Sequence, residues 1–112
     1  MAKFEFRTIG NFDEIVGALD RSILDSALTM RLVEESLIVC RGARVSVRVY
    51  DQYFMRNSSR AALTLTVVEA DGEVAISAIG SGGGTGAIFN FSYGAESKMV
   101  GVVEDAVRRM GL

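Results

Sequence analysis

Histidine, tryptophan and proline are absent from the 112-residue chain, and cysteine occurs once, as Cys40. Histidine is the usual general base at neutral pH, so its absence excludes a Ser-His-Asp or Cys-His catalytic unit. One cysteine without histidine cannot form a closed zinc site or an internal disulfide. The sequence therefore predicts a non-enzymatic protein with no metal and no cofactor, in which Cys40 is a small buried hydrophobe rather than a reactive thiol.

Long apolar runs and charge of one sign are also lacking. No stretch of about 18 uncharged apolar residues exists and no signal peptide begins the chain, so we expect a cytoplasmic protein without a membrane partner. The net charge of −2 argues against a nucleic-acid partner. Hydrophobic residues reach 49 %, more than so small a domain hides, which favours a homodimer or another homo-oligomer.

Alternation of apolar and polar residues predicts most of the secondary structure. Strands are expected at residues 3–9, 44–54, 61–69 and 73–79, the last two joined by an Asp71-Gly72 hairpin turn. Amphipathic helices are expected at 12–26 and 95–110. The segment 28–41 fits a bent strand, a hairpin or a helix, and Glu34-Glu35 within it is interpreted as a solvated turn.

The order of these segments predicts one α+β domain over residues 1–112. An antiparallel sheet of about five strands would carry the two helices on one face, with a further short strand at 87–91. The order matches the strand-helix-four-strand-helix layout of folds like the TATA-binding protein. Fold alone carries no function, and the helix-free face is where a partner would bind.

Arginine side chains provide one candidate ligand site. If Val45, Val47 and Val49 face the core, then Arg44, Arg48 and Tyr50 project from the outer face of the same strand. Such a face would suit a small anionic ligand or a nucleic-acid backbone. The alternative is a solvated face on which the arginines pair with acidic residues of a neighbouring strand.

A glycine-rich segment at 80–86 provides the second candidate. Its backbone N–H groups, at Ser81, Gly82, Gly83, Gly84 and Thr85, are of the kind that cradles phosphate. The segment lacks the lysine of a Walker A loop and the strand-loop-helix setting of a dinucleotide site. The alternative is a plain connection between strands.

Several segments together resemble a family of small bacterial domains of unknown function. They are Arg48 to Tyr53, Leu63 to Thr66, the Ser77 to Gly83 strand and loop, Phe89 to Phe91, and the Gly94-Ala95-Glu96 helix start. The resemblance implies one bacterial domain over nearly the whole chain and assigns no site residues. We therefore expect a self-associating binding or interaction domain. A small-anion-binding domain and a nucleic-acid-binding sheet are the alternatives.

Overall fold

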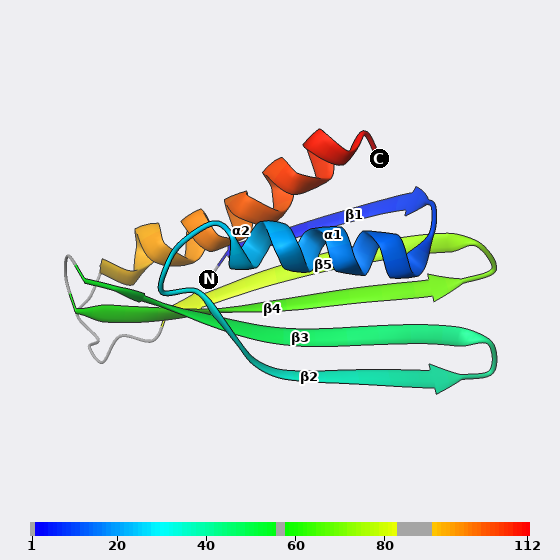
Figure 1. Ribbon diagram of the computed structural model, residues 1–112, viewed down its shortest axis with the longest axis horizontal. Coiled ribbons are helices and arrows are strands. Elements are labelled where there is room, and N and C mark those ends of the chain that lie inside the picture. Colours follow the sequence, from blue (N-terminus) through cyan, green and yellow to red (C-terminus); the bar gives the residue numbers. More distant parts are fainter. Residues whose placement is uncertain (1, 56–57, 83–90) are drawn as a thin grey trace.

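The computed structural model describes residues 2–55, 58–82 and 91–112, with the backbone alone at 91–95. It contains five strands and two helices in the order β-α-β-β-β-β-α (Figure 1). The elements are β1 (Ala2–Ile9), α1 (Phe12–Leu24), β2 (Arg31–Cys40), β3 (Ala43–Phe54), β4 (Ser59–Ala70), β5 (Glu73–Gly82) and α2 (Phe91–Met110). The α+β class and the antiparallel sheet are confirmed.

The strands lie in the order β1-β5-β4-β3-β2, and every neighbouring pair is antiparallel. Both helices lie on the same face of this sheet, and β2 is the strand farthest from them (Figure 1). Strands β1 and β2 are therefore the two edges. The likeness to the TATA-binding protein stays a prediction.

The core fills the layer between the helices and one sheet face. Helix α1 contributes Leu19 and Ile23, and α2 contributes Val103, all with no exposed surface. Opposite them lie alternate residues of β4 and β5, all of them buried: Leu63, Leu65, Val67, Val74, Ile76 and Ala78. Asn11 begins α1 as its N-cap, because its side chain accepts a hydrogen bond from the Glu14 N–H.

The segment 28–41 contains one strand, β2, which has a register shift between Leu32 and Glu34. Of the alternatives, the bent strand is correct, and the interpretation of Glu34-Glu35 as a turn is wrong because both residues pair with β3. Of the short strand expected at 87–91, residues 87–90 lie outside the described residues. Phe91, its last residue, belongs to α2. Asp71 and Gly72 have the positive φ of the predicted hairpin turn.

Candidate functional site

The prediction that Arg44, Arg48 and Tyr50 project from the helix-free face is wrong. Tyr50 has no exposed surface. All three side chains contact an acidic residue of α1, which is Asp13 for Arg44 and Asp20 for the other two. The register explains the reversal. Arg48 lies opposite Leu65, and Tyr50 opposite Leu63, so these residues share the face that the helices cover. Val45, Val47 and Val49 consequently face away from the helices.

Arg44 connects the sheet to the first turn of α1. Its Nε donates a 3.0 Å hydrogen bond to Glu69 of β4, and its Nη1 lies 3.3 Å from Asp13 Oδ2. The guanidinium carbon also lies 4.5 Å from the centre of the Phe12 ring, a cation–π contact. The pairing with Glu69 is the alternative that the sequence allowed, although it forms on the helix-covered face.

Arg48 and Tyr50 meet one carboxylate of α1. The Tyr50 hydroxyl donates a 2.6 Å hydrogen bond to Asp20 Oδ1, and Arg48 Nη1 donates to the same oxygen at 3.1 Å. Arg48 Nη2 lies 3.1 Å from Glu35 Oε1 on β2. Burial, and then the Asp20 carboxylate, raises the pKa of Tyr50 above its ordinary value. The tyrosine is therefore neutral and acts as the donor.

These contacts bear on the predicted anion site. Arg44 and Arg48 are each paired with two carboxylates, so an anion bound there would have to replace an existing ion pair. Ser81 and Gly82 end β5, with Ser81 opposite Ala62. Gly83, Gly84 and Thr85 lie outside the described residues. An anion site at these positions stays a prediction, and the structure does not bring Ser81 to the two arginines, because Ser81 follows the opposite face of the sheet.

Another surface, along the end of β2 that leads into the β2–β3 turn, has four consecutive exposed apolar side chains. We call Leu37, Ile38, Val39 and Cys40 the apolar edge. Leu37 is 64 % exposed, Ile38 52 % and Val39 65 %. Cys40 is exposed as well, so the expectation that it is a buried hydrophobe is wrong. Leu37 and Val39 lie on the helix side of the strand, and Ile38 and Cys40 on the other, so the edge is apolar on both faces.

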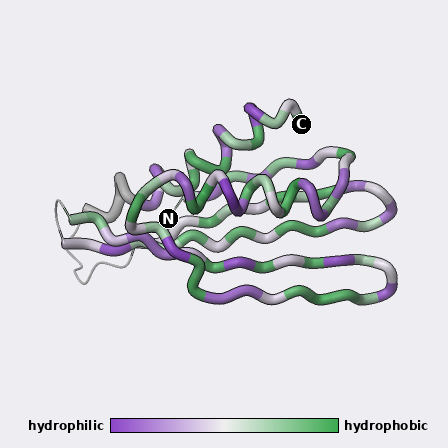
Figure 2. The backbone as a smooth tube through the Cα atoms, viewed as in Figure 1, coloured by the Kyte–Doolittle hydropathy of each residue, from purple (hydrophilic) through white to green (hydrophobic). Residues whose placement is uncertain are grey.

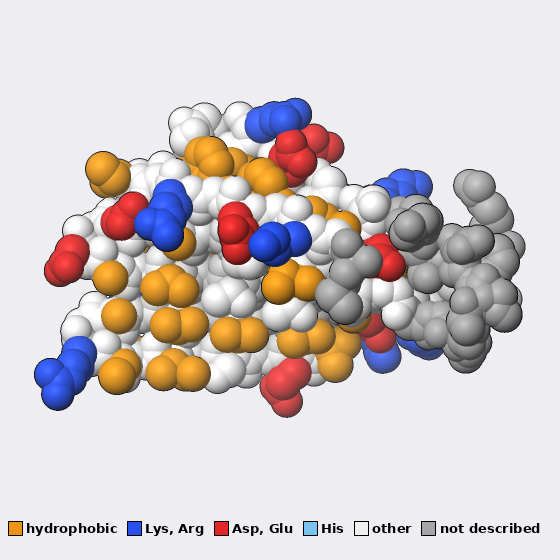
Figure 3. Space-filling view, turned by 180° about the vertical axis from the view of Figure 1, so that it is seen from behind, with side chains coloured by type: hydrophobic (Ala, Val, Ile, Leu, Met, Phe, Trp, Pro, Cys, Tyr) orange, Lys and Arg blue, Asp and Glu red, His pale blue; other side chains and the backbone are white. Residues whose placement is uncertain are grey.

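The apolar edge continues onto the helix-free face of the sheet. Ile38 lies opposite Val45, Val45 opposite Val68, and Val68 opposite Ala75. Val47 and Val49 extend this row along β3, and we call Val45, Val47, Val49 and Val68 the valine face. Figure 3 shows the resulting rows of hydrophobic side chains from behind. A contiguous apolar surface of this kind marks an interaction site more often than an isolated exposed residue does.

The other edge of the sheet is different. On β1, the side chains of Lys3, Glu5 and Arg7 are all exposed on the helix-free side, and α2 packs against the strand. Charged side chains and a covering helix are the usual protections of a sheet edge. Of the two edges of the sheet, β2 is therefore the one with an unprotected apolar surface.

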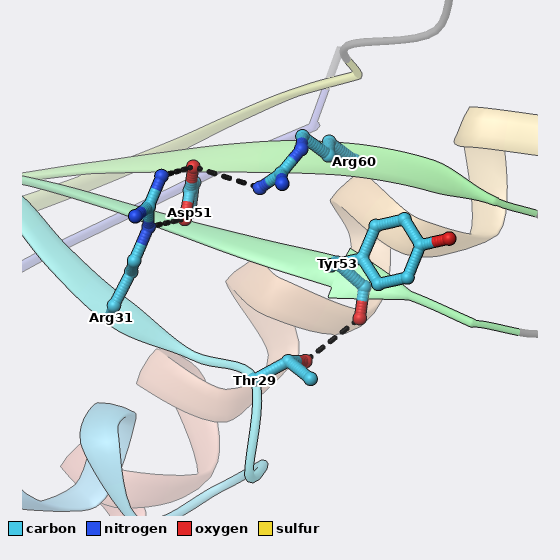
Figure 4. A network of polar contacts seen from close by, with 5 residues as sticks. All are labelled: Thr29, Arg31, Asp51, Tyr53 and Arg60. Carbon is cyan, nitrogen blue, oxygen red and sulfur yellow. Dashed lines mark hydrogen bonds and ion pairs between the residues drawn. The ribbon is translucent and has the colours of Figure 1, made fainter.

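A polar cluster fastens the start of β2 to the sheet (Figure 4). Arg31 Nε donates a 2.8 Å hydrogen bond to Asp51 Oδ1, and Arg60 Nη1 lies 3.4 Å from Asp51 Oδ2. The hydrogen bond from Arg31 holds the pKa of Asp51 below its ordinary value. Thr29 Oγ1 donates to the Tyr53 carbonyl at 2.7 Å. These contacts hold one end of β2 in place and leave its hairpin end uncovered.

The residues of the apolar edge were not among the predicted site residues. The available signal was the run Leu37 to Cys40, four apolar residues in succession where a half-buried strand would alternate. A run of that kind needs cover on both faces. Because β2 is an edge beyond both helices, neither face receives full cover.

The described part of the chain has no helix long and apolar enough to cross a membrane. Within the same ranges, no group of three or more cysteine and acidic side chains is placed to hold a metal ion.

The fold and this surface define an α+β domain with two helices on one sheet face and one unprotected apolar edge. The chain belongs to DUF6054, a family of unknown function, whose sequence model matches residues 1–111. The expected resemblance to a family without an assigned function is thereby confirmed, while the bacterial origin stays a prediction. No curated protein matches the chain.

Proposed function

We propose that the protein is a non-enzymatic interaction domain that self-associates through the apolar edge of β2 and the adjoining valine face. The observation that carries the proposal is the exposure of Leu37, Ile38 and Val39 at 64 %, 52 % and 65 %. Burying apolar surface contributes roughly 25 cal/mol per Å². Covering these three side chains in an interface would therefore offset much of the cost of association.

Ile38 is the best position for a test, because it belongs to the apolar edge and also lies in the row that continues through Val45. Its side chain is half exposed in the single chain, so Ile38→Lys leaves the fold intact, with a cost of about 0.5 kcal/mol or less. In an interface, the same substitution would bury an ammonium group among apolar side chains, which is strongly unfavourable.

The matched control is Ile9→Lys. Ile9 is 82 % exposed and ends β1, at the opposite edge of the sheet. The two variants make the same chemical change on an exposed strand residue and add the same charge. A difference between them therefore reports the location and not the substitution.

Multi-angle light scattering at micromolar concentration measures the outcome. We expect the wild type and Ile9→Lys to have a mass above the 12.1 kDa of one chain, and Ile38→Lys to return to that mass. Urea unfolding of each variant shows that the fold is retained. A wild type with the mass of one chain would refute the proposed self-association. An Ile38→Lys variant that associates like the wild type would refute the proposed surface.

A further inference from the structure

The outer edge of β2 has main-chain hydrogen-bonding groups to offer as well as apolar side chains. Cys40 and Ala43 flank a two-residue turn with positive φ at both positions. Residues that flank such a turn form a hydrogen-bonded pair, and the pairs alternate from there along an antiparallel ladder. Val39, Leu37 and Glu35 therefore direct their N–H and C=O groups away from β3, toward the outer edge.

The apolar part of this edge, Leu37 to Cys40, lacks the usual protections against further pairing. Lysine, proline and bulges are what normally prevent a strand from adding to a sheet edge. The register shift of β2 lies between Leu32 and Glu34, at the far end, and the segment from Glu34 to Cys40 contains no lysine or proline. Among the strands that the structure describes, only β3 pairs with β2. The segment is thus a regular strand with one unused side.

The charges on β2 match those of a second, antiparallel copy. Two acids, Glu34 and Glu35, precede the apolar edge, and Arg41 follows it. Figure 2 shows the same order toward the hairpin, with a hydrophilic stretch of β2 followed by a hydrophobic one and then by a hydrophilic turn. In an antiparallel pair, the acidic end of each strand lies beside the basic end of the other. Because a two-fold axis relates the two copies, this pairing of acidic and basic ends occurs twice in the dimer.

We infer that a second copy of this chain pairs with β2 along its outer edge, antiparallel, with Ile38 opposite Ile38 on a two-fold axis perpendicular to the sheet. This inference rests on the proposed self-association and names its geometry. The five strands of each copy then form one continuous sheet, with all helices on the same side. The outward N–H and C=O groups of Leu37 exchange hydrogen bonds with Val39 of the second copy.

The side chains select this register. Residues opposite one another must lie on the same face, so the strand can slip only by two residues at a time relative to its partner. With Ile38 on the axis, Leu37 meets Val39 and Glu35 meets Arg41. Arg48 already binds Oε1 of Glu35, but the Glu35 side chain remains 55 % exposed and accessible to a second arginine.

One neighbouring register, with Leu37 on the axis, places Glu35 opposite Val39 and Glu34 opposite Cys40. Glu35 then lies against an apolar side chain instead of a guanidinium, and Glu34 lies against a thiol. That arrangement forfeits two ion pairs, and it desolvates acids that gain no partner. The register on Ile38 is therefore favoured over the register on Leu37.

Cys40 makes the register directly measurable. With Ile38 on the axis, Cys40 lies opposite Ser36 of the second copy in a non-hydrogen-bonded pair, where Cα atoms are about 4.5 Å apart, within the range of a disulfide. In the variant Ser36→Cys, the introduced thiol of each copy would bond to Cys40 of the other when diamide accepts the two electrons and two protons. Within one chain, residues 36 and 40 are about 13 Å apart along the strand and cannot bond.

The experiment compares Ser36→Cys with Glu34→Cys, which samples the neighbouring register, and with Ser36→Cys combined with Cys40→Ser. Each is oxidised with diamide and separated on a non-reducing gel. We expect a covalent dimer for Ser36→Cys, at least tenfold faster than for Glu34→Cys, and little for the double variant. Wild type should also stay monomeric on the gel, because Cys40 does not face itself.

The outcomes separate this inference from the proposed function. Faster crosslinking of Glu34→Cys would overturn the register on Ile38. Equally slow crosslinking of both, in a protein that light scattering shows to be associated, would overturn strand pairing while the self-association stands. That result would point to contact through the valine faces. If light scattering shows that the protein is monomeric, both the strand pairing and the proposed self-association are refuted.

Discussion

Gly80 lies on β5 at a position where α2 comes close to the sheet. A Cβ atom at this position would lie 2.7 Å from the backbone oxygen of Glu96 and 3.1 Å from Val100 Cγ2. Both Gly80 and Glu96 belong to the segments that carry the family resemblance, one in the strand and the other at the helix start. A side chain at residue 80 would therefore push the helix off the sheet.

We predict that Gly80→Ala lowers the free energy of unfolding by about 1–3 kcal/mol, the usual cost of overpacking a well-packed site. Gly101→Ala is the matched control. It lies within α2, and a Cβ atom added there would meet no heavy atom within 4 Å, so alanine should stabilise the helix by about 0.5–1 kcal/mol. Urea unfolding measures both, and equal effects of the two substitutions would contradict the close-approach argument.

At the scale of elements, α1 is joined to the sheet by matched charges. Asp13 and Asp20 are seven residues apart, two helical turns, so they lie on one side of α1 about 10 Å apart. Arg44 and Arg48 are four residues apart on β3, about 13 Å. The similar spacing lets each arginine reach one aspartate. This correspondence between helix and strand was present in the sequence as a signal for which face the arginines take.

Other aspects of the elements follow from the sequence without the structure. Strands β1, β3, β4 and β5 and both helices are predicted by periodicity. The face of β3 is not, because Val45, Val47 and Val49 are more hydrophobic than Arg44, Ser46 and Arg48, and the rule that apolar residues face the core selects the wrong side. The register with β4 shows which face it takes. The candidate edge was missed for the related reason that strand order is a property of the whole sheet.

The contact between Tyr50 and Asp20 gives a prediction at this scale. Tyr50→Phe removes a buried hydrogen bond to a carboxylate, and should lower the free energy of unfolding by about 1.5–3 kcal/mol. The phenylalanine ring fills the same space and leaves no cavity. The loss of unfolding free energy therefore measures the contribution of the Tyr50 hydroxyl. The control is Tyr53→Phe, which removes a hydroxyl from a partly exposed ring and should change stability by less than about 0.5 kcal/mol.

The effect of Tyr50→Phe should also depend on pH. Because the folded protein raises the pKa of Tyr50, the hydroxyl contributes its full stability below the ordinary tyrosine value of about 10 and loses it as the pH rises above that value. The difference between wild type and variant, measured by urea unfolding, should be constant near neutral pH and shrink in alkali. A difference that grows with pH would contradict the assignment of Tyr50 as a neutral donor to Asp20.

At the scale of the molecule, the two edges of the sheet differ in their side chains and in their cover by the helices. Edge β1 carries charged side chains and a covering helix, whereas β2 carries apolar side chains on both faces and lies beyond α1 and α2. A monomer would gain stability and solubility from charges at β2. The asymmetry is explained if the β2 edge is covered in the assembled protein and the β1 edge is not.

Stability should then depend on concentration. When unfolding separates two associated copies, mass action raises the melting temperature with protein concentration. For a chain of this size we expect about 2–4 °C for each tenfold increase. Ile38→Lys should melt at a temperature independent of concentration, and Ile9→Lys should follow the wild type. Differential scanning calorimetry measures all three. A wild-type melting temperature that does not change with protein concentration would contradict the prediction. It would show that the single chain is stable with the surface of β2 exposed, and that a second copy does not stabilise the native state.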